Sequence, residues 1–238
     1  MKDQFDRIEY SAFIGNDESR GAHYAAVIDA LDLKNGNLVS ILDIGCGSGD
    51  FEVLLANKFP HLNNILAYDP QSVQVSEAKK KSLENVEFVC CSTLHFDRDQ
   101  KFDFAVSILV LPYAETQEDL NDVFAVASRH LKPCGKFISV TYNPDFDPDE
   151  EQILASRNFE RLGLNGLGVK FVDPENGGVQ FETKAVQHGA NSYMAAAHLS
   201  GFSKISHDVL YLDKNGARMS SDNGLIARQP YMVLECIK

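Results

Sequence analysis

The sequence predicts an α/β fold in which a doubly wound, mostly parallel sheet of seven strands carries helices on both faces. Two observations lead to this prediction. Short apolar runs alternate with segments of helical periodicity, which is typical of parallel strands joined by right-handed crossovers. The length of 238 residues suits one domain with an insertion better than two independent domains. We therefore expect a single domain over residues 1–238.

An N-terminal helical cap is expected over residues 1–33, ahead of the first strand. Apolar side chains recur there at helical spacing, and Tyr10 and Tyr24 interrupt the apolar faces with hydroxyl groups. A tyrosine in such a position usually packs with its polar tip at the surface. The alternative is that one of the two tyrosines closes over a ligand.

The first strand is expected at residues 38–44, a short apolar run that fits a central parallel strand. Gly45, Gly47 and Gly49 follow at alternate positions and predict a turn with positive φ or a backbone that a ligand approaches closely. A helix is expected to begin near residues 48–50, with its free N–H groups facing the turn. By themselves the glycines are compatible with an ordinary loop as well as with a nucleotide site.

The second expected strand, residues 65–69, ends in Asp69, 20 residues after Gly49. In dinucleotide-type folds an acid at this position accepts hydrogen bonds from ribose hydroxyls. Asp69 also has an interpretation as a helix cap, because Pro70 suits the first turn of a following helix. The two interpretations are compatible.

The remaining elements continue the alternation as far as Tyr142. Thr116 and Asp119 form a capping-box-like start for a helix that ends near Leu131. The other helices are expected at 71–83 and 191–199, and the other strands at 86–91, 102–111, 136–142, 202–212 and 230–237.

The alternation breaks at residues 143–187, which are rich in glycine, proline and acidic residues. Segments 168–172 and 179–183 alternate in polarity and are expected to pair as a hairpin. A structureless connection of this length is unusual. We therefore interpret 143–187 as an inserted substrate lid.

Composition narrows the range of partners. The net charge of -12 opposes attraction to nucleic acid and to anionic lipid. The chain has no apolar run of about 18 residues and no signal-peptide core at its N-terminus, so we expect a cytoplasmic protein. The five cysteines show neither a C-x-x-C pair nor zinc-finger spacing, which favours reduced thiols and no metal site. A small-molecule ligand is the remaining expectation, with the chain a monomer or a homodimer.

Residues 38–143 resemble the class I S-adenosylmethionine-dependent methyltransferases, which have a Rossmann-like fold, and residues 191–238 add a compatible helix and two strands. Four landmarks occur in the family's order and spacing, at 41–49, 67–70, 102–113 and 131–136. The N-terminal helices and the insertion look like those of small-molecule methyltransferases. The segments Tyr142-Asn143-Pro144 and Gln229-Pro230-Tyr231, with the glycine-rich hairpin, are loosely similar to toxoflavin synthase-like N-methyltransferases.

The resemblance implies S-adenosylmethionine as the cofactor and S-adenosylhomocysteine as the product. Asp43 and the glycine turn would face its amino-acid portion, and Asp69 its ribose. Cys90, Cys91 and Ser92 stand where family members often carry Gly-Asp-Ala, so backbone groups around Ser92 and Thr93 would replace the missing carboxylate at the adenine. The cofactor-binding residues expected on this basis are Tyr10, Asp43, Gly45, Gly47, Gly49, Asp69, Pro70, Cys91, Ser92 and Leu109.

Methyl transfer from a sulfonium is an in-line displacement that depends mainly on alignment and on exclusion of water. A general base helps only where the acceptor must lose a proton early. Tyr113, Tyr142 and His188 are the candidates, although the default interpretation of His188 is a surface histidine. The expected substrate contacts are Tyr113, Tyr142, Asn143 and Phe171; for Phe171 and Phe181 the simpler expectation is that they pack the hairpin.

Two alternatives remain at this stage. An NAD-dependent oxidoreductase shares the strand, the turn and the ribose acid, but its G-x-G-x-x-G fingerprint requires a glycine at the position of Asp50. A non-catalytic S-adenosylmethionine-binding module would keep the fold for sensing or assembly. The intact glycine turn and the insertion argue against this second alternative.

Overall fold

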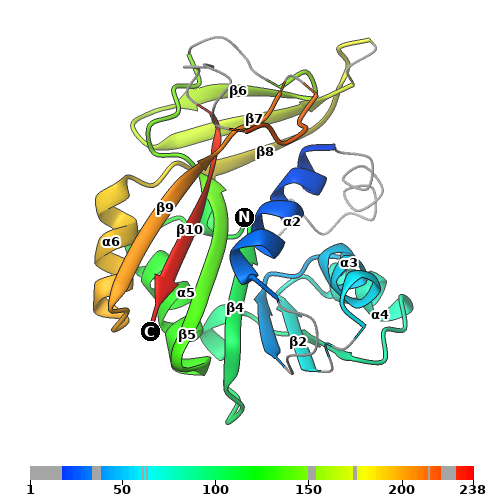
Figure 1. Ribbon diagram of the computed structural model, residues 1–238. Helices are drawn as coiled ribbons and strands as arrows, with labels where there is room; N and C mark the ends of the chain where they lie inside the picture. The colour runs from blue at the N-terminus through cyan, green and yellow to red at the C-terminus, as the bar shows by residue number, and fades with distance from the viewer. Residues whose placement is uncertain are drawn as a thin grey trace.

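A seven-stranded sheet forms the centre of the computed structural model, which describes residues 18–33, 39–60, 62, 64–149, 154–173, 176–213, 215–220 and 229–238 (Figure 1). The strand order is β3-β2-β1-β4-β5-β10-β9. Strands β1 to β5 are parallel, and β10 runs antiparallel to both β5 and β9. The strands are β1 (Ser40–Ile44), β2 (Asn64–Asp69), β3 (Val86–Cys90), β4 (Phe102–Ile108), β5 (Leu131–Tyr142), β9 (Lys204–Leu210) and β10 (Tyr231–Ile237). The predicted doubly wound, mostly parallel sheet is confirmed.

Helices cover both faces of this sheet, because successive strand residues point to opposite sides. Ile41 packs in the cluster that contains apolar side chains of α2 and α3, whereas Leu42 and Ile44 pack in the cluster formed with α5 and α6. Figure 1 shows α2, α3 and α4 on one face and α5 and α6 on the other. The helices are α2 (Glu18–Leu31), α3 (Asp50–Lys58), α4 (Ser72–Lys80), α5 (Gln117–His130) and α6 (Ala190–Leu199).

Helix α5 begins and ends close to the predicted positions. The Thr116 hydroxyl accepts the Asp119 N–H at 3.1 Å, and the Asp119 carboxylate accepts the Thr116 N–H at 2.9 Å. This reciprocal pair is a capping box with aspartate in place of glutamate. β5 starts at Leu131, five residues earlier than the expected 136, because the register with β4 shifts between Phe102 and Phe104. A bulge of this kind absorbs extra residues without ending the pairing.

The insertion, residues 143–187, contains a second, three-stranded antiparallel sheet of β6 (Arg157–Leu162), β7 (Gly166–Val172) and β8 (Val179–Val186). Phe171 pairs with Phe181 across β7 and β8, and their ring centroids lie 5.6 Å apart, which confirms the predicted hairpin and its packing. β6 was not predicted. Its sequence, RNFERL, has three charged residues and no β-branched one, so it gives a weak strand signal.

The insertion is fastened to the main sheet at both of its ends. Gln187 Nε2 donates to the carbonyl oxygens of Asn143 (2.8 Å) and Phe146 (2.7 Å), which joins the last residue of the insertion to its first turn. Asn143 Nδ2 donates to the carbonyl of Gln229, just before β10, at 3.0 Å. Leu167 is fully buried in the same apolar cluster as the core of the main sheet. In Figure 1 the second sheet therefore lies across one end of the first.

Two further expectations concern features outside the sheets. All five cysteines are free thiols, as expected. None of the described helices is both long enough and apolar enough to cross a lipid bilayer. Of the N-terminal cap, α2 is described, whereas Tyr10 and the rest of 1–17 lie outside the described residues.

Gly49 joins the glycine turn to α3 and leads to a stability prediction. Its φ is +78°, and a Cβ there would lie 2.9 Å from the Phe88 ring and 3.0 Å from Ala78 Cβ. Gly49→Ala adds overpacking to backbone strain, so we expect it to lower the free energy of unfolding by about 2–5 kcal/mol. Gly201→Ala is the matched control, since Gly201 has φ +80° and an added Cβ meets nothing within 4 Å.

We expect Gly201→Ala to cost only the backbone term, about 1–2 kcal/mol. Urea unfolding of both variants, followed by circular dichroism, measures the difference. Equal losses in the two variants would contradict the packing role of Gly49.

Candidate functional site

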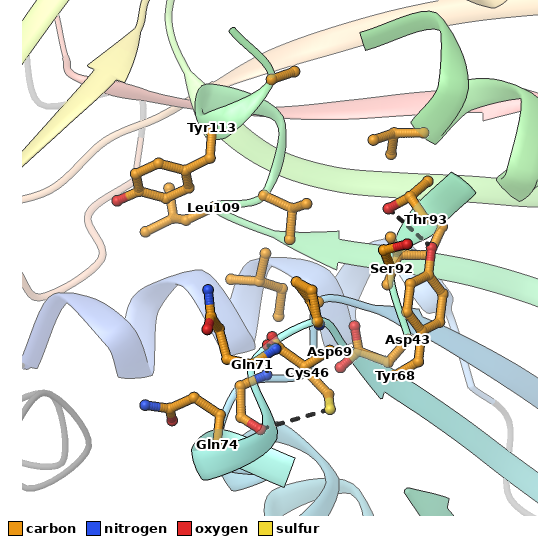
Figure 2. A pocket seen from close by; sticks show the side chains of 18 of the residues that line it. Asp43, Cys46, Tyr68, Asp69, Gln71, Gln74, Ser92, Thr93, Leu109 and Tyr113 are labelled. Atoms are coloured by element: carbon orange, nitrogen blue, oxygen red, sulfur yellow. Dashed lines mark hydrogen bonds between the residues drawn. The ribbon is translucent and has the colours of Figure 1, made fainter. Parts of the chain in front are cut away.

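A cavity of about 780 Å³ opens at the carboxyl ends of β1, β2 and β4, between the main sheet and the insertion. Ligands of open α/β sheets bind at this edge, and the volume lies in the range of about 300–1,000 Å³ that small-molecule sites occupy. Its wall includes the glycine turn, the ends of β2 and β4, residues of α2, and Phe171 of the insertion. Figure 2 shows Gln71 and Gln74 across the cavity from Leu109 and Tyr113.

The three glycines of the turn differ in what they contribute. The N–H groups of Gly45 and Cys46 both donate to the Tyr68 carbonyl, at 2.7 and 3.0 Å, which binds the turn to the end of β2. A Cβ on Gly45 would lie 2.4 Å from a methyl group of Val110, so this position has no room for a side chain. Gly47 has φ +54° and lines the cavity, and a Cβ there would meet no atom within 4 Å. Gly47 therefore leaves its backbone open to a ligand.

Asp69 joins the two turns that form the floor of the cavity. Its carboxylate accepts the N–H of Gly47 at 3.0 Å and the N–H of Gln71 at 2.8 Å. Burial raises its pKa, and these two hydrogen bonds oppose the shift. The helix-cap interpretation needs a correction: Gln71 is the N-cap residue of α4, and Pro70 precedes the helix. Asp69 instead holds the backbone just before that cap, while lining the cavity.

Asp43 and Glu52 form a buried pair of carboxyl groups behind the glycine turn. Strand alternation turns Asp43 towards the face that α3 covers, where Glu52 is fully buried. Both Glu52 oxygens and Asp43 Oδ1 lack a hydrogen-bond donor among the described residues. A proton on Glu52 therefore allows the two carboxyl groups to hydrogen-bond to each other.

The charge on this pair is set by burial and by mutual repulsion. Burial raises the pKa of Asp43 to about 6, although the hydrogen bond from Glu52 lowers it. Burial and then the Asp43 charge raise the pKa of Glu52 well above its ordinary value. Both shifts favour a proton on this pair, and the carboxyl group of Asp43 lines the cavity. Sequence reasoning missed Glu52; an acid between Phe51 and Leu55 on an apolar helix face was the available signal.

The segment after β3 forms another wall. Ser92 and Thr93 line the cavity; the Ser92 hydroxyl lies 2.7 Å from His95 Nδ1, and the Tyr68 hydroxyl donates to Thr93 Oγ1 at 3.5 Å. The Cys91 N–H donates to the Asp69 carbonyl at 3.1 Å, while its thiol turns to the Ser92 carbonyl. Cys91 therefore supports this wall rather than lining it.

β4 leaves the sheet at Leu109, earlier than the expected end at 111. Leu109 has φ +57°, a conformation uncommon outside glycine, and its N–H donates to the Val140 carbonyl at 2.9 Å. The chain then enters a 3₁₀ turn, Leu111–Tyr113, which carries Tyr113 into the cavity wall. Burial raises the pKa of Tyr113 to about 12, so its hydroxyl is neutral at pH 7.

The other predicted site residues have different surroundings. Tyr142 lines the cavity and stacks on Tyr231 at 5.5 Å. Asn143 lies at the start of the insertion, where its side chain donates to the Gln229 carbonyl. The expectation of a surface position for His188 is wrong: it is buried, and its Nε2 bonds to the Ala114 carbonyl at 2.9 Å. Burial lowers its pKa, so a neutral imidazole donates this bond and holds the turn that carries Tyr113.

Several lining residues come from elements far from the glycine turn in sequence. Helix α2 contributes Arg20, His23 and Tyr24, and β6 contributes Arg157. Arg20 pairs with Asp50 at 2.8 Å, and the Tyr24 ring lies 5.3 Å from that of Phe51. The alternative that Tyr24 lies against the ligand site agrees with this position. Sequence reasoning missed the other three, because only the tertiary fold brings α2 and β6 to this edge.

Residues 41–135 match a family model described as a methyltransferase domain. The fold also agrees with that of S-adenosylmethionine-bound CalS10 from Micromonospora echinaspora, an amino pentose methyltransferase: the TM-score is 0.60 at 16% identity, covering 98% of this chain and 97% of the other. Residues 41–135 are thus similar to a methyltransferase domain, and the fold of the chain is that of a solved methyltransferase. This result favours the methyltransferase interpretation over the NAD-dependent alternative.

Other relatives of this methyltransferase domain differ in what they methylate. The chain is 29% identical over 136 residues to malonyl-[acyl-carrier protein] O-methyltransferase 2 of Ilyobacter polytropus (52% of this chain, 50% of the relative). It is 32% identical over 117 residues to the ubiquinone/menaquinone biosynthesis C-methyltransferase UbiE of Rickettsia prowazekii (44% of each). The sugar N-methyltransferase KedS8 of Streptoalloteichus shares the fold, with a TM-score of 0.66 at 18% identity over 96% of this chain and 92% of the other. The chain spans half or less of the length of the two curated relatives.

The residues of the cavity fit S-adenosylmethionine, a cation with ribose hydroxyls. Asp43 and Asp69 supply carboxylate oxygens beside the open backbone of Gly47, and Ser92 and Thr93 supply hydroxyl groups on another wall. A carboxylate is the group that best compensates a buried ammonium or sulfonium charge. The cavity thus has an acidic floor that suits a cationic ligand.

The buried carboxyl pair predicts an unusual dependence of stability on pH. The folded protein keeps the Glu52 proton to higher pH than the unfolded chain does, so stability is lost as pH rises from about 4.3 through the folded pKa of Glu52. In Glu52→Gln the side-chain amide can still donate a hydrogen bond to Asp43, but position 52 no longer carries a group that titrates. We expect its free energy of unfolding to exceed that of the wild type by a margin that grows by about 1 kcal/mol per pH unit between pH 5 and pH 7.

Urea unfolding at a series of pH values measures this margin. Glu77→Gln is the matched control, because Glu77 lies on α4 at the surface and pairs with Lys80 at 2.6 Å. We expect no such growing margin in the control. A margin for Glu52→Gln that stays constant with pH would show that Glu52 holds no proton in the folded state.

Proposed function

We propose that this chain transfers a methyl group from S-adenosylmethionine to a small-molecule acceptor by in-line displacement. The observation that supports the proposal is a single cavity that joins the acidic glycine turn to an aromatic wall contributed by Tyr113, Tyr142 and Phe171. One part of the cavity suits a cationic cofactor and the other suits an apolar acceptor. Their continuity is what direct transfer between two ligands requires.

The proposed cofactor contacts follow the floor of the cavity. Asp43 would bind the ammonium group of the amino-acid portion, and Asp69, already fixed by two backbone N–H groups, would accept hydrogen bonds from the ribose. Ser92 and Thr93 would contact the adenine, and Leu109 would lie beneath the sulfonium. Of the other expected cofactor residues, Cys91 has a supporting position behind this wall, and Tyr10 lies outside the described residues.

The proposed work of the protein at the acceptor end is positioning. When bound, S-adenosylmethionine supplies a methyl group that its sulfonium already activates. The insertion, docked on the sheet through Gln187 and Asn143, would act as a lid that excludes water from the cavity. Tyr113 keeps its proton at neutral pH and would donate a hydrogen bond to the acceptor rather than remove a proton.

A direct assay tests the proposal. The purified chain is incubated with S-adenosylmethionine and, in separate reactions, panels of amines, phenols and carboxylic acids, and S-adenosylhomocysteine is measured by mass spectrometry. We expect binding of S-adenosylmethionine without binding of NAD, and release of S-adenosylhomocysteine that depends on an acceptor. Binding with no release in any panel would favour the non-catalytic module, and binding of NAD alone would overturn the proposal.

Asp69 provides a test of the cofactor site. Asp69→Ala removes an acceptor that also positions Gly47 and Gln71, so we expect S-adenosylmethionine to bind at least tenfold more weakly, about 1.4 kcal/mol. Asp103→Ala is the matched control: Asp103 likewise accepts a backbone N–H, from Ser40 at 2.8 Å, but at the other end of the sheet. Calorimetric titration compares the variants. Unchanged affinity in Asp69→Ala would leave Asp69 a purely structural role.

A further inference from the structure

Glu52 is an acidic side chain in a position where packing favours an apolar one. It lies on the buried face of α3 that also carries Phe51 and Leu55, and it is fully buried. Acidic side chains are almost never fully buried unless they have a partner. An aliphatic side chain of similar volume would serve the packing of this face at least as well. Packing therefore does not account for the carboxyl group.

The partner of Glu52 is Asp43, the acid of β1 that lines the cavity. Both oxygens of Glu52 and Oδ1 of Asp43 are buried, and no donor from the described part of the chain reaches them. Two carboxyl groups in contact satisfy each other when one of them is protonated and donates to the other. Asp43 belongs to the cavity wall, whereas Glu52 lies behind it. Glu52 therefore acts on a ligand in the cavity only through Asp43.

The position of the cavity decides which of the two groups keeps a proton when a cation binds. Burial raises the pKa of Asp43 to about 6, and the hydrogen bond from Glu52 opposes this shift. Burial, and then the Asp43 charge, raises the pKa of Glu52. A cation in the cavity meets Asp43 first, so it favours the negative charge there and leaves the proton on Glu52.

The neutral groups around this pair come from three elements. Burial raises the pKa of Tyr24 on α2, of Cys46 in the glycine turn and of Tyr68 on β2. These hydroxyl and thiol groups therefore add no charge to the pair between pH 5 and pH 7.

The charged and titratable groups around the pair come from four elements. Lys81, after α4, favours the charged form of the pair, and Asp69, on β2, disfavours it. Arg20 on α2 and Asp50 on α3 pair with each other at 2.8 Å. His23 on α2 lines the same cavity. All five side chains are still present when position 52 is changed, so a comparison of variants at that position isolates the contribution of Glu52.

We propose that Glu52 is a positioning residue for the cofactor: its protonated carboxyl group donates a hydrogen bond to Asp43 and holds the Asp43 carboxylate towards the ammonium group of S-adenosylmethionine. The hydrogen bond favours the charged form of Asp43, which the ammonium group requires, over the protonated form, which competes with it. Without this donor, Asp43 takes up a proton at higher pH. This inference rests on the proposed function, because it concerns the cofactor of that reaction.

Two ligands test the proposal without requiring turnover. S-adenosylhomocysteine carries the ammonium group, whereas methylthioadenosine carries the adenine and the ribose without it. Both are titrated calorimetrically at pH 5, 6 and 7, where an α-amino group stays largely protonated. In the wild type we expect the affinity for S-adenosylhomocysteine to fall as pH falls through about 6, because Asp43 becomes protonated.

Glu52→Leu fills a similar space without a donor. We expect S-adenosylhomocysteine to bind this variant about tenfold more weakly at pH 5 and pH 6, the scale of one hydrogen bond to a charged group, with a smaller loss at pH 7. The loss shrinks as pH rises because Asp43 then ionises without help. We expect the affinity for methylthioadenosine to equal that of the wild type.

Glu52→Gln is the conservative variant, because its side-chain amide still donates to Asp43. We expect it to keep the wild-type affinity for S-adenosylhomocysteine at each pH. Glu77→Gln is the matched control for the loss of an acid, since Glu77 pairs with Lys80 at 2.6 Å on α4. We expect this control to match the wild type with both ligands.

The outcomes separate this proposal from the proposed function. Equal affinities of Glu52→Leu and the wild type for S-adenosylhomocysteine would overturn the role of Glu52. Equal losses in Glu52→Leu and Glu52→Gln would also overturn it, because Glu52 would then act through a negative charge. A loss in Glu52→Leu that is the same for both ligands would contradict a role at the ammonium group. Failure of the wild type to bind S-adenosylhomocysteine at any pH would instead overturn the proposed function.

Discussion

The floor of the cavity depends on the two hydrogen bonds that the Asp69 carboxylate accepts from backbone N–H groups. The carboxylate accepts one N–H from the turn after β1 and one from the turn after β2, so a single side chain fixes the relative position of two adjacent loops. The Tyr68 carbonyl strengthens the same junction by accepting two N–H groups of the glycine turn. These bonds consume part of Asp69's hydrogen-bonding capacity, and the remainder faces the cavity. A structural role and the proposed ligand-binding role therefore coincide in one residue.

Two buried carboxyl groups behind this junction destabilise the folded protein when both are charged. Asp43 and Glu52 are buried together, and Asp69 lies close enough to raise the pKa of Asp43 further. Holding one proton on the pair reduces the repulsion, and a cation bound beside Asp43 would reduce it again. A buried acidic cluster that is costly in the ligand-free protein is thus consistent with the cationic cofactor that we propose.

The insertion completes the cavity rather than merely covering it. Its strands share an apolar cluster with the core of the main sheet. Hydrogen bonds of Gln187 and Asn143 join its two ends to each other and to the segment before β10. Arg157 and Phe171 consequently reach the cavity from a fixed platform. His188, just beyond the insertion, holds the turn that carries Tyr113. The proposed acceptor end is therefore built from three segments that are distant in sequence, and its side chains differ in chemistry from those of the glycine turn.

The sequence by itself determined the order of strands and helices, the glycine turn, Asp43 and Asp69, because these features depend on local periodicity and on spacings within a few tens of residues. It did not reveal β6, the burial of Glu52 and His188, or the lining residues Arg20, His23 and Arg157. Each of these depends on which surfaces come together: strand alternation places Glu52 against Asp43, and docking of the insertion brings Arg157 beside Phe171 and Tyr231. Local sequence patterns predict whether a segment is a helix or a strand and which of its faces is apolar. The partner of a buried polar group depends instead on long-range packing.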